Sequence, residues 1–217
     1  MTKAFLRARR PEHKQQRRAA ILDAARELAI RSGVREVSLG GVAEAAGMAK
    51  SNLARYFATR EEIYLELAAQ EWKDWERAVL DRLAGSPAPD TLIDTLTGTL
   101  AERPLFCELL SHTVTTLEHN VTIEAARRFK LVTLDVQFTL AKAVAQACPE
   151  FTGNEARELV AAAAALASLL YPAANPPPVI AELYDREPAL AAAAGVPFEP
   201  AMKRMLTAIA AGLPTLR

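Results

Sequence analysis

A short run of cationic and amide side chains, residues 50–56, carries the most specific chemistry in this sequence. Lysine, arginine and tyrosine side chains hold phosphate oxygens, and asparagine and arginine can make paired hydrogen bonds to base edges in the major groove of DNA. Leu53 and Phe57, four residues apart, would form the apolar side of a short helix. The pattern therefore predicts contacts with double-stranded DNA from Lys50, Ser51, Asn52, Arg55 and Tyr56.

Two short helices and a tight turn are expected to position this run. Ser38 can cap the first helix with its hydroxyl, and we also expect it to contact DNA. Gly47 provides the positive φ that a sharp turn between helices requires. The second helix is expected over Lys50–Phe57. Thr59, followed three residues later by Glu62, matches a capping box that would start a third helix at once.

This arrangement is a helix-turn-helix, a motif whose second helix lies in the major groove. Over roughly residues 12–75 the sequence resembles the DNA-binding domain of the TetR family of transcriptional regulators. The resemblance depends on Ala46-Gly47-Met48, Lys50, Leu53, Tyr56-Phe57 and Thr59-x-Glu61-Glu62. It implies a three-helix DNA-binding domain joined to a helical body that dimerises and encloses a small-molecule site.

The sequence departs from the family pattern at four positions. Gly40 and Gly41 stand inside the first short helix, where the family usually has larger polar residues. Each glycine costs that helix about 1 kcal/mol relative to alanine. Ala49 replaces the usual hydroxyl cap of the second helix, and Ala54 stands where many relatives carry an aromatic residue. These departures change the expected contacts with DNA and leave the motif intact.

The composition predicts an all-α protein, because alanine and other helix formers dominate the 217 residues. The net charge of zero hides an asymmetry between the two ends of the chain. Residues 1–60 hold 13 Lys/Arg against 5 Asp/Glu, a balance of +8, and residues 61–217 hold 13 against 21, a balance of −8. Only the front end is therefore expected to meet a polyanion, although an ordinary solvated basic helix would show the same balance.

The sequence contains no G-x-G-x-x-G, P-loop or H-E-x-x-H motif, so we do not expect an enzyme. Cys107 and Cys148 have no metal spacing and are expected to be buried thiols. His112 and His119 have no partner spacing typical of a metal site, and no cofactor is expected. The apolar run 159–174 is shorter than the ~20 residues that cross a bilayer. We therefore expect a soluble cytoplasmic protein without a membrane partner.

The chain is expected to begin with a basic arm, residues 1–11, that either touches DNA or stays idle. A first long helix should follow over Glu12–Arg31 and end at Gly33. Arg17 and Arg18 lie near the front of that helix, where they could reach phosphates; Arg17 completes the predicted DNA-contacting set. Together with the helix-turn-helix, these elements predict a DNA-binding domain over residues 1–58.

Residues 59–217 are expected to form a larger helical body for ligand binding and dimerisation. A linker at residues 85–89 interrupts it, Asp90 and Asn120 would cap two helices, and Thr152 with Glu155 would form a second capping box. A break is expected at Pro172 and at the triple proline 176–178. The helices are expected over residues 59–83, 91–102, 104–117, 121–147, 156–170, 179–194 and 198–212.

Two of these helices, near 156–170 and 198–212, predict a homodimer. The first is rich in alanine and leucine on nearly every side, and the second offers another apolar stripe. A monomer would expose too much of this apolar surface, whereas a four-helix bundle built from both subunits would bury it. Members of the TetR family dimerise in this way, so the resemblance implies the same. A two-fold dimer would present two recognition helices to a palindrome-like operator.

The middle helices, 91–147, are expected to surround a small-molecule site together with two tryptophans of the preceding helix. The expected lining is mostly apolar with a few polar groups. Plain core packing is the alternative for each residue, and in particular the two tryptophans would fill the seam between domains. The candidate lining residues are Trp72, Trp75, Phe106, Cys107, Leu110, His112, Phe129, Phe138 and Tyr171.

The sequence thus predicts a DNA-binding regulator that a small hydrophobic compound releases from its operator. Two alternatives share the same DNA-binding surface. One is a dimer that binds DNA without any small-molecule inducer, and the other is an activator, since the sign of regulation depends on where the operator lies. The sequence names neither the inducer nor the operator.

Overall fold

A computed structural model describes residues 3–85 and 89–217 of the protein. Every regular element in these two ranges is helical, which confirms the all-α prediction. The elements are α1 Lys3–Ser32, α2 Leu39–Ala45, α3 Lys50–Leu53, α4 Arg60–Gly85, α5 Pro89–Ala101, α6 Pro104–His112, the π-helix η1 Thr113–Leu117, α7 Ile123–Ala147, α8 Gly153–Ala174, α9 Pro178–Arg186, α10 Pro188–Ala194, α11 Phe198–Gly212 and the 3₁₀ helix η2 Leu213–Leu216.

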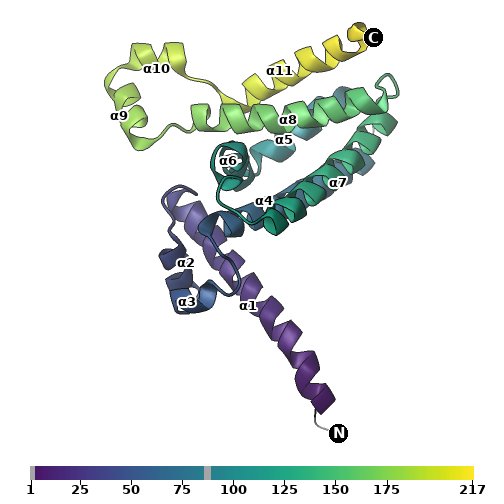
Figure 1. The fold of residues 1–217 in the computed structure, drawn as a ribbon. Helices are drawn as coiled ribbons and strands as arrows, with labels where there is room; N and C mark the ends of the chain where they lie inside the picture. The colour runs from purple at the N-terminus through teal and green to yellow at the C-terminus, as the bar shows by residue number, and fades with distance from the viewer. Residues whose placement is uncertain (1–2, 86–88) are drawn as a thin grey trace.

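Helices α1, α2 and α3 form a small unit that we call the head; the elements from α4 onward form the body (Figure 1). Ile21 and Ala25 of α1 are completely buried, as is Leu53 of α3, and Phe57 is almost completely buried. These residues share the apolar sides that their spacing predicts. The first turns of α1 extend past α2 and α3 and away from the body (Figure 1).

The turn between α2 and α3 has the expected local chemistry. The Ser38 hydroxyl caps α2 by accepting a hydrogen bond from the Gly41 N–H at 3.1 Å. Gly47 has a φ of 64°, the left-handed conformation that a residue with a Cβ avoids. Helix α3 ends at Leu53, so the prediction of a helix to Phe57 was wrong. The Tyr56 N–H donates to the carbonyl of Leu53, three residues earlier, at 2.8 Å, and this tighter hydrogen bond turns the chain.

Replacing Gly47 with alanine is expected to lower the free energy of unfolding by about 1–2 kcal/mol, the cost of a side chain in the left-handed region. Gly40→Ala is the matched control, because a Cβ there would meet the Ser38 Oγ at an ordinary 3.7 Å. That change removes a helical glycine and should stabilise the protein by up to about 1 kcal/mol. Urea unfolding measures both, and shifts of the same sign would contradict the assigned turn.

One arginine of the body donates hydrogen bonds to three main-chain carbonyls of the loop before α2 and so joins the head to the body. Arg60, at the start of α4, donates to the carbonyl oxygens of Val34, Arg35 and Val37 at 3.0–3.1 Å. The Val34 N–H in turn donates to Glu108 of α6 at 2.6 Å. Loop carbonyls and amides that have no helical partner are thus satisfied by charged side chains from the body. The head is therefore held at its Gly33 end by hydrogen bonds from two body helices.

The start of α4 has half of the predicted capping box. The Thr59 hydroxyl accepts a bond from the Glu62 N–H at 3.2 Å, as expected. Glu62 does not return to Thr59, because its carboxylate accepts the N–H of Ala58 at 2.9 Å and two bonds from Thr122, which precedes α7. The carboxylate therefore ties the head–body corner to α7 instead of closing a local box.

The core of the body lies where α4, α6, α7 and α8 pack together, with α5 and α11 alongside. Trp75, Phe106 and Leu140 have no exposed surface, and Val160 and Leu206 are equally buried on the later helices. At one edge of the body α8 and α11 lie side by side, on the side opposite the head (Figure 1). Helices α9 and α10 reach outward from that edge and contain no buried residue.

Proline residues account for two differences at the ends of α1 and α8. Pro11 was expected to end a basic arm, yet α1 runs through it to Lys3. Pro172 was expected to break the chain, yet α8 continues to Ala174. An internal proline removes one hydrogen bond and crowds the carbonyl four residues before it. Near a helix end this cost is limited, because little helix lies beyond the proline, and residues 3–10 are mostly good helix formers.

Several other boundaries also differ from the sequence-based expectation. Thr122, and not Asn120, caps α7 by accepting from the Ala125 N–H at 3.3 Å. Pro188 divides the expected single helix 179–194 into α9 and α10. Helix α5 begins at Pro89, so Asp90 lies within it instead of preceding it, and part of the expected linker falls outside the described residues. The Thr152–Glu155 capping box and the bounds of α11 are as predicted.

Helix α8 has 22 residues and contains an 18-residue stretch with a mean hydropathy of 1.2, so its length and composition would allow it to cross a membrane. The sequence predicted an apolar run over residues 159–174 that is too short to cross a bilayer. That prediction was wrong about length, because α8 spans 22 residues. A core helix of a soluble protein has the same properties, and α8 packs against α6, α7 and α11.

Candidate nucleic-acid interface

A groove of about 630 Å³ separates the front half of α1 from α3 and the turn that follows it. Most of its lining residues carry a cation, an amide, an imidazole or a phenol that can contact DNA, and Met48 forms an apolar wall. Their side chains come from α1, from α3 and from the turns on either side of α3, and Ile21 and Leu53 belong to the buried core beneath them. The lining residues are His13, Lys14, Arg17, Met48, Asn52, Arg55 and Tyr56.

The structure brings most of the predicted DNA-contacting residues to this groove. Arg17, Asn52 and Arg55 line it and are exposed, and Tyr56 lines it while half-buried. Lys50 and Ser51 are exposed on α3 beside it. Ser38 is also exposed, although its hydroxyl is already engaged as the cap of α2. The predicted set therefore shares one face of the head.

The cations of this face have no partner within the described residues. Lys14, Arg17, Lys50 and Arg55 form no ion pair or hydrogen bond with any described group. Because an unpaired cation is free to replace the counterions of DNA, these four side chains are suited to phosphate contacts. Asn52, whose side chain makes no hydrogen bond among the described residues, is equally free to pair with a base edge.

Arg18 has a different role from the phosphate contact that its position in the sequence suggests. Its Nε donates to Glu66 Oε1 at 2.8 Å, its Nη2 pairs with Glu66 Oε2, and its Nη1 donates to the Tyr56 carbonyl at 2.8 Å. The guanidinium also lies 4.0 Å from the centre of the Phe57 ring. Arg18 therefore fastens the turn after α3 to α4. The prediction that Arg18 contacts a phosphate was wrong.

Sequence reasoning missed His13 and Lys14, which line the groove from the front half of α1. Both were close to the boundary assigned between a basic arm and the first helix. The signal was present, because His13 and Lys14 lie four and three residues before Arg17, a spacing that places both beside Arg17 on one face of a helix. Only the three-dimensional structure shows that this face of α1 lines the same groove as Asn52 and Arg55.

The predicted ligand residues divide into a packed aromatic cluster and scattered others. Trp72 and Trp75 have ring centres 5.5 Å apart, and Phe106 lies 5.3 Å from Trp72 and 5.9 Å from Trp75. The Trp75 Nε1 donates to Thr99 at 2.9 Å. The Trp72 Nε1 is buried without an acceptor among the described residues. A ligand oxygen could satisfy this donor.

The remaining predicted ligand residues do not all join this cluster. Cys107 and Leu110 are buried on α6, and burial raises the pKa of the Cys107 thiol to about 12, so it stays protonated. Tyr171 packs edge to face with Phe198 at 5.8 Å. Phe129 is buried toward α4, whereas Phe138 is 54% exposed on the opposite part of α7. Among the described residues Phe138 makes no ring contact with the other aromatic candidates.

His112 and Glu108 lie at the joint between the head and the body. Desolvation, with the charges of Arg35 and Arg60, lowers the pKa of His112, so its imidazole is neutral near pH 7. Desolvation also raises the pKa of Glu108 above its usual 4.5, partly offset by the hydrogen bond from the Val34 N–H. Within the described residues no group of three or more His, Cys, Asp or Glu side chains could hold a metal ion.

Glu108→Gln should change how stability depends on pH. In the native protein the raised pKa means that Glu108 holds its proton above pH 4.5, where the unfolded chain has lost it, so its contribution to stability falls as pH rises past 4.5. Glutamine keeps an oxygen for the Val34 N–H and cannot ionise. The stability of the variant relative to the wild type should therefore increase from pH 4.5 to 7. Urea unfolding at several pH values measures this difference, and a decrease would contradict the assigned burial.

Family models match both the head and the body of this chain. Residues 21–67 match the model of bacterial regulatory proteins of the tetR family, and residues 69–217 match the tetracyclin repressor-like C-terminal domain. Among curated proteins, none matches this chain significantly in sequence.

Three solved structures share the fold. FadR of Thermus thermophilus, described as a TetR-family transcriptional repressor in complex with lauroyl-CoA, has a TM-score of 0.57 at 16% identity, covering 90% of this chain and 92% of its own. FadR of Bacillus halodurans, a fatty acid degradation regulator, has a TM-score of 0.52 at 12% identity, covering 91% and 94%. The multidrug binding protein EbrR, complexed with imidazole, has a TM-score of 0.54 at 19% identity, covering 89% of each chain.

The two matched models lie end to end and cover the helix-turn-helix and the whole body. The C-terminal model alone accounts for more than half of the chain. Members of this family are DNA-binding transcriptional regulators and not enzymes. The chain, with its helix-turn-helix head and helical body, therefore belongs to the TetR family of transcriptional regulators.

Proposed function

We propose that this protein is a cytoplasmic repressor that binds an operator as a homodimer and leaves it when a small hydrophobic compound binds the body. Residues 1–58 form the DNA-binding domain in this proposal, and residues 59–217 form the ligand-binding and dimerisation domain. The observation that carries the proposal is the groove between α1 and α3, where unpaired cations and a free amide share one exposed face.

Affinity and specificity would come from different members of this face. Lys14, Arg17 and Lys50 would neutralise phosphates, which gives a binding constant that falls steeply with salt. Asn52 and Arg55 would read base edges, each good paired contact contributing about 1–3 kcal/mol of discrimination. This division follows from the side chains, because a lysine is a point charge whereas asparagine and arginine match two atoms of a base.

Dimerisation would join the α8–α11 edge of one subunit to that of a second copy. Leu169 of α8 is 68% exposed and Met205 of α11 is 43% exposed, and the exposed Ala165 and Ala161 lie four and eight residues before Leu169, on the same side of α8. An apolar face of this kind costs free energy in water and is removed from it by a second copy. The edge lies opposite the head, so both heads would remain free to contact one duplex (Figure 1).

A ligand-binding body is supported by two observations. FadR of Thermus thermophilus carries lauroyl-CoA and EbrR carries imidazole, so the shared fold accommodates small molecules in those proteins. In this chain the Trp72 Nε1 is a buried donor without an acceptor among the described residues, beside the aromatic rings of Trp75 and Phe106. A compound with an apolar part and one acceptor would suit that surrounding.

Selection of duplexes from a random DNA library tests the proposal, because the selection itself reveals the operator sequence. The purified protein should enrich sequences with two related half-sites in inverted repeat. Binding to the enriched duplex should weaken at least about tenfold between roughly 50 and 200 mM salt, since several phosphate contacts are expected. Enrichment of no sequence at low salt would contradict the proposal. Enrichment of a single half-site would contradict the dimeric form of it.

A further inference from the structure

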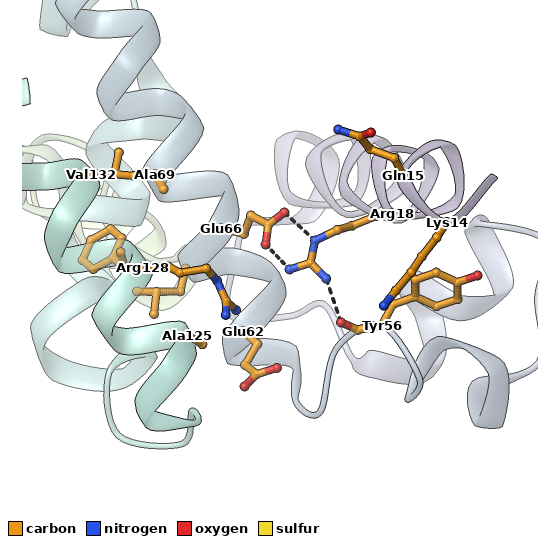
Figure 2. A pocket seen from close by; sticks show the side chains of 12 residues that line it. Lys14, Gln15, Arg18, Tyr56, Glu62, Glu66, Ala69, Ala125, Arg128 and Val132 are labelled. Atoms are coloured by element: carbon orange, nitrogen blue, oxygen red, sulfur yellow. Dashed lines mark hydrogen bonds and ion pairs between the residues drawn. The ribbon is translucent and has the colours of Figure 1, made fainter. Parts of the chain in front are cut away.

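A cleft of about 720 Å³ lies between the head and the body, bounded by α1, α4 and α7 (Figure 2). Its volume is within the range of about 300–1,000 Å³ that small-molecule sites occupy. Leu65, Ala125 and Phe129 are buried and form an apolar floor, extended by the half-buried Ala69 and Val132. The cleft is distinct from the Trp72–Trp75–Phe106 cluster, because none of those three residues lines it.

The acidic residues of the cleft are already satisfied. Glu66 pairs with Arg18 through both of its oxygens. Glu62 accepts hydrogen bonds from the Ala58 N–H, the Thr122 N–H and the Thr122 hydroxyl at 2.6–3.1 Å. Desolvation raises the pKa of Glu62, but these bonds and the charge of Arg128 outweigh it, so the net pKa is lowered and the group stays ionised.

Two cations of the cleft have no such partner. Lys14 of α1 and Arg128 of α7 form no hydrogen bond or ion pair with any described residue, and both are exposed at the rim. Figure 2 shows the Lys14 side chain beside Tyr56 and the Arg128 side chain beside Glu62 and Ala125. The charge of Arg128 acts on Glu62, but neither cation donates a hydrogen bond to a described residue. An apolar floor with such cations above it is complementary to a molecule that carries one anionic group on an apolar body.

We propose that this cleft binds a small amphipathic carboxylate, whose apolar part covers Leu65 and Phe129 and whose carboxylate pairs with Arg128. The proposal rests on the repressor function proposed above and gives it a second, specific location for the effector. The binding energy has two sources, burial of the apolar part and a charge-assisted hydrogen bond to the guanidinium.

Arg18 gives the cleft a direct connection to the DNA-contacting face. One guanidinium lines the cleft, holds Glu66 of α4 and donates to the main-chain carbonyl of Tyr56, directly after Arg55 (Figure 2). A ligand held by Arg128 occupies the same cleft as this guanidinium, and its negative charge competes with Glu66 for the attraction of Arg18. In the proposal this competition weakens the link between α4 and the turn after α3, and with it the binding of DNA.

Two residues also belong to both surfaces. Lys14 and Tyr56 line the cleft and the DNA-contacting groove alike. A ligand that recruits the Lys14 ammonium takes a phosphate contact away from DNA. By thermodynamic linkage DNA must weaken ligand binding by the same factor that the ligand weakens DNA binding, typically about 5–150-fold.

Decanoate, decanol and decyltrimethylammonium form the probe series, since they share one apolar chain and differ in charge. Isothermal titration calorimetry with the full-length protein should show saturable binding of decanoate, at least tenfold tighter than decanol, and no binding of the cation. Saturating decanoate should weaken the affinity for a selected duplex at least tenfold by fluorescence anisotropy. Each variant is compared with its own duplex affinity in the absence of the probe.

Arg128→Gln should lower decanoate affinity about tenfold and leave decanol affinity unchanged. Arg127→Gln is the matched control, because Arg127 is the adjacent arginine of α7 and does not line the cleft. It removes the same charge and should bind decanoate as the wild type does. Circular dichroism of both variants confirms that each is folded, and Trp72→Phe tests the aromatic cluster of the body as the competing location.

The outcomes separate the cleft from the repressor function. Equal losses in the Arg127 and Arg128 variants, or equal binding of decanoate and decanol, would overturn the cleft as a carboxylate site. A loss of decanoate in Trp72→Phe alone would place the ligand in the body and would also overturn it. If decanoate binding depends on Arg128 but the DNA selection enriches no duplex, the result would support the cleft as a carboxylate site and contradict the repressor function.

Discussion

Arg55→Ala is expected to remove most of the discrimination between a selected duplex and a scrambled one. Arg55 is exposed on the turn after α3, lines the groove between α1 and α3 and has no partner among the described residues. A paired contact from arginine to guanine contributes about 1–3 kcal/mol, so affinity for the selected duplex should fall about 5–150-fold. Anisotropy titrations of both duplexes at one salt concentration measure the effect.

Arg31→Ala is the control for this experiment, because Arg31 is an exposed arginine at the other end of α1 and does not line the groove. It removes the same charge from the same domain. Its affinity for the selected duplex should stay near that of the wild type. If Arg55→Ala weakens the selected and scrambled duplexes alike, and flattens the dependence on salt, then Arg55 contacts a phosphate and not a base.

Leu169→Glu should convert the proposed dimer into a folded monomer. Leu169 is 68% exposed on α8, so a glutamate causes no clash within one subunit, whereas two buried carboxylates would face an apolar interface in the dimer. Multi-angle light scattering at micromolar concentration should report one chain for the variant and two for the wild type. Because one head then binds alone, operator affinity should fall more than about a hundredfold.

Leu131→Glu provides the matched control, because Leu131 is 51% exposed and belongs to α7, which is not part of the proposed α8–α11 interface. It introduces the same charge at a similarly exposed leucine and should leave the mass and the operator affinity unchanged. A dimeric Leu169→Glu protein would exclude the outer side of α8 from the interface. A wild-type monomer would contradict the dimer itself.

Local chemistry in the sequence predicted those elements that short-range contacts determine. The Ser38 cap, the positive φ of Gly47, the Thr152–Glu155 box and the bounds of α11 all depend on residues within about four positions of one another. The polar residues of 50–56 were likewise found on one face, because the buried Leu53 and Phe57 fix the orientation of this short segment. Periodicity and capping rules apply directly in such cases.

Tertiary contacts decided what the sequence did not predict. Glu62 looked like half of a local box, but Thr122, sixty residues later, occupies its carboxylate. Arg18 looked like a phosphate ligand, but Glu66 and the Tyr56 carbonyl take all three donating nitrogens. The cleft beside Arg128 is formed by three helices that are far apart in the sequence, so no single stretch carries its signal.

The hydrogen bond from Arg18 to residue 56 ends on a main-chain oxygen. Every amino acid offers that oxygen, so exchanging the phenol for any other side chain leaves the bond possible. In the proposed function, base recognition can therefore be altered at residues 52 and 55 while the contact from Arg18 to the residue 56 carbonyl is kept. If the proposed repressor is redirected to a different promoter through residues 52 and 55 alone, Tyr56 and the rest of the proposed effector cleft stay unchanged.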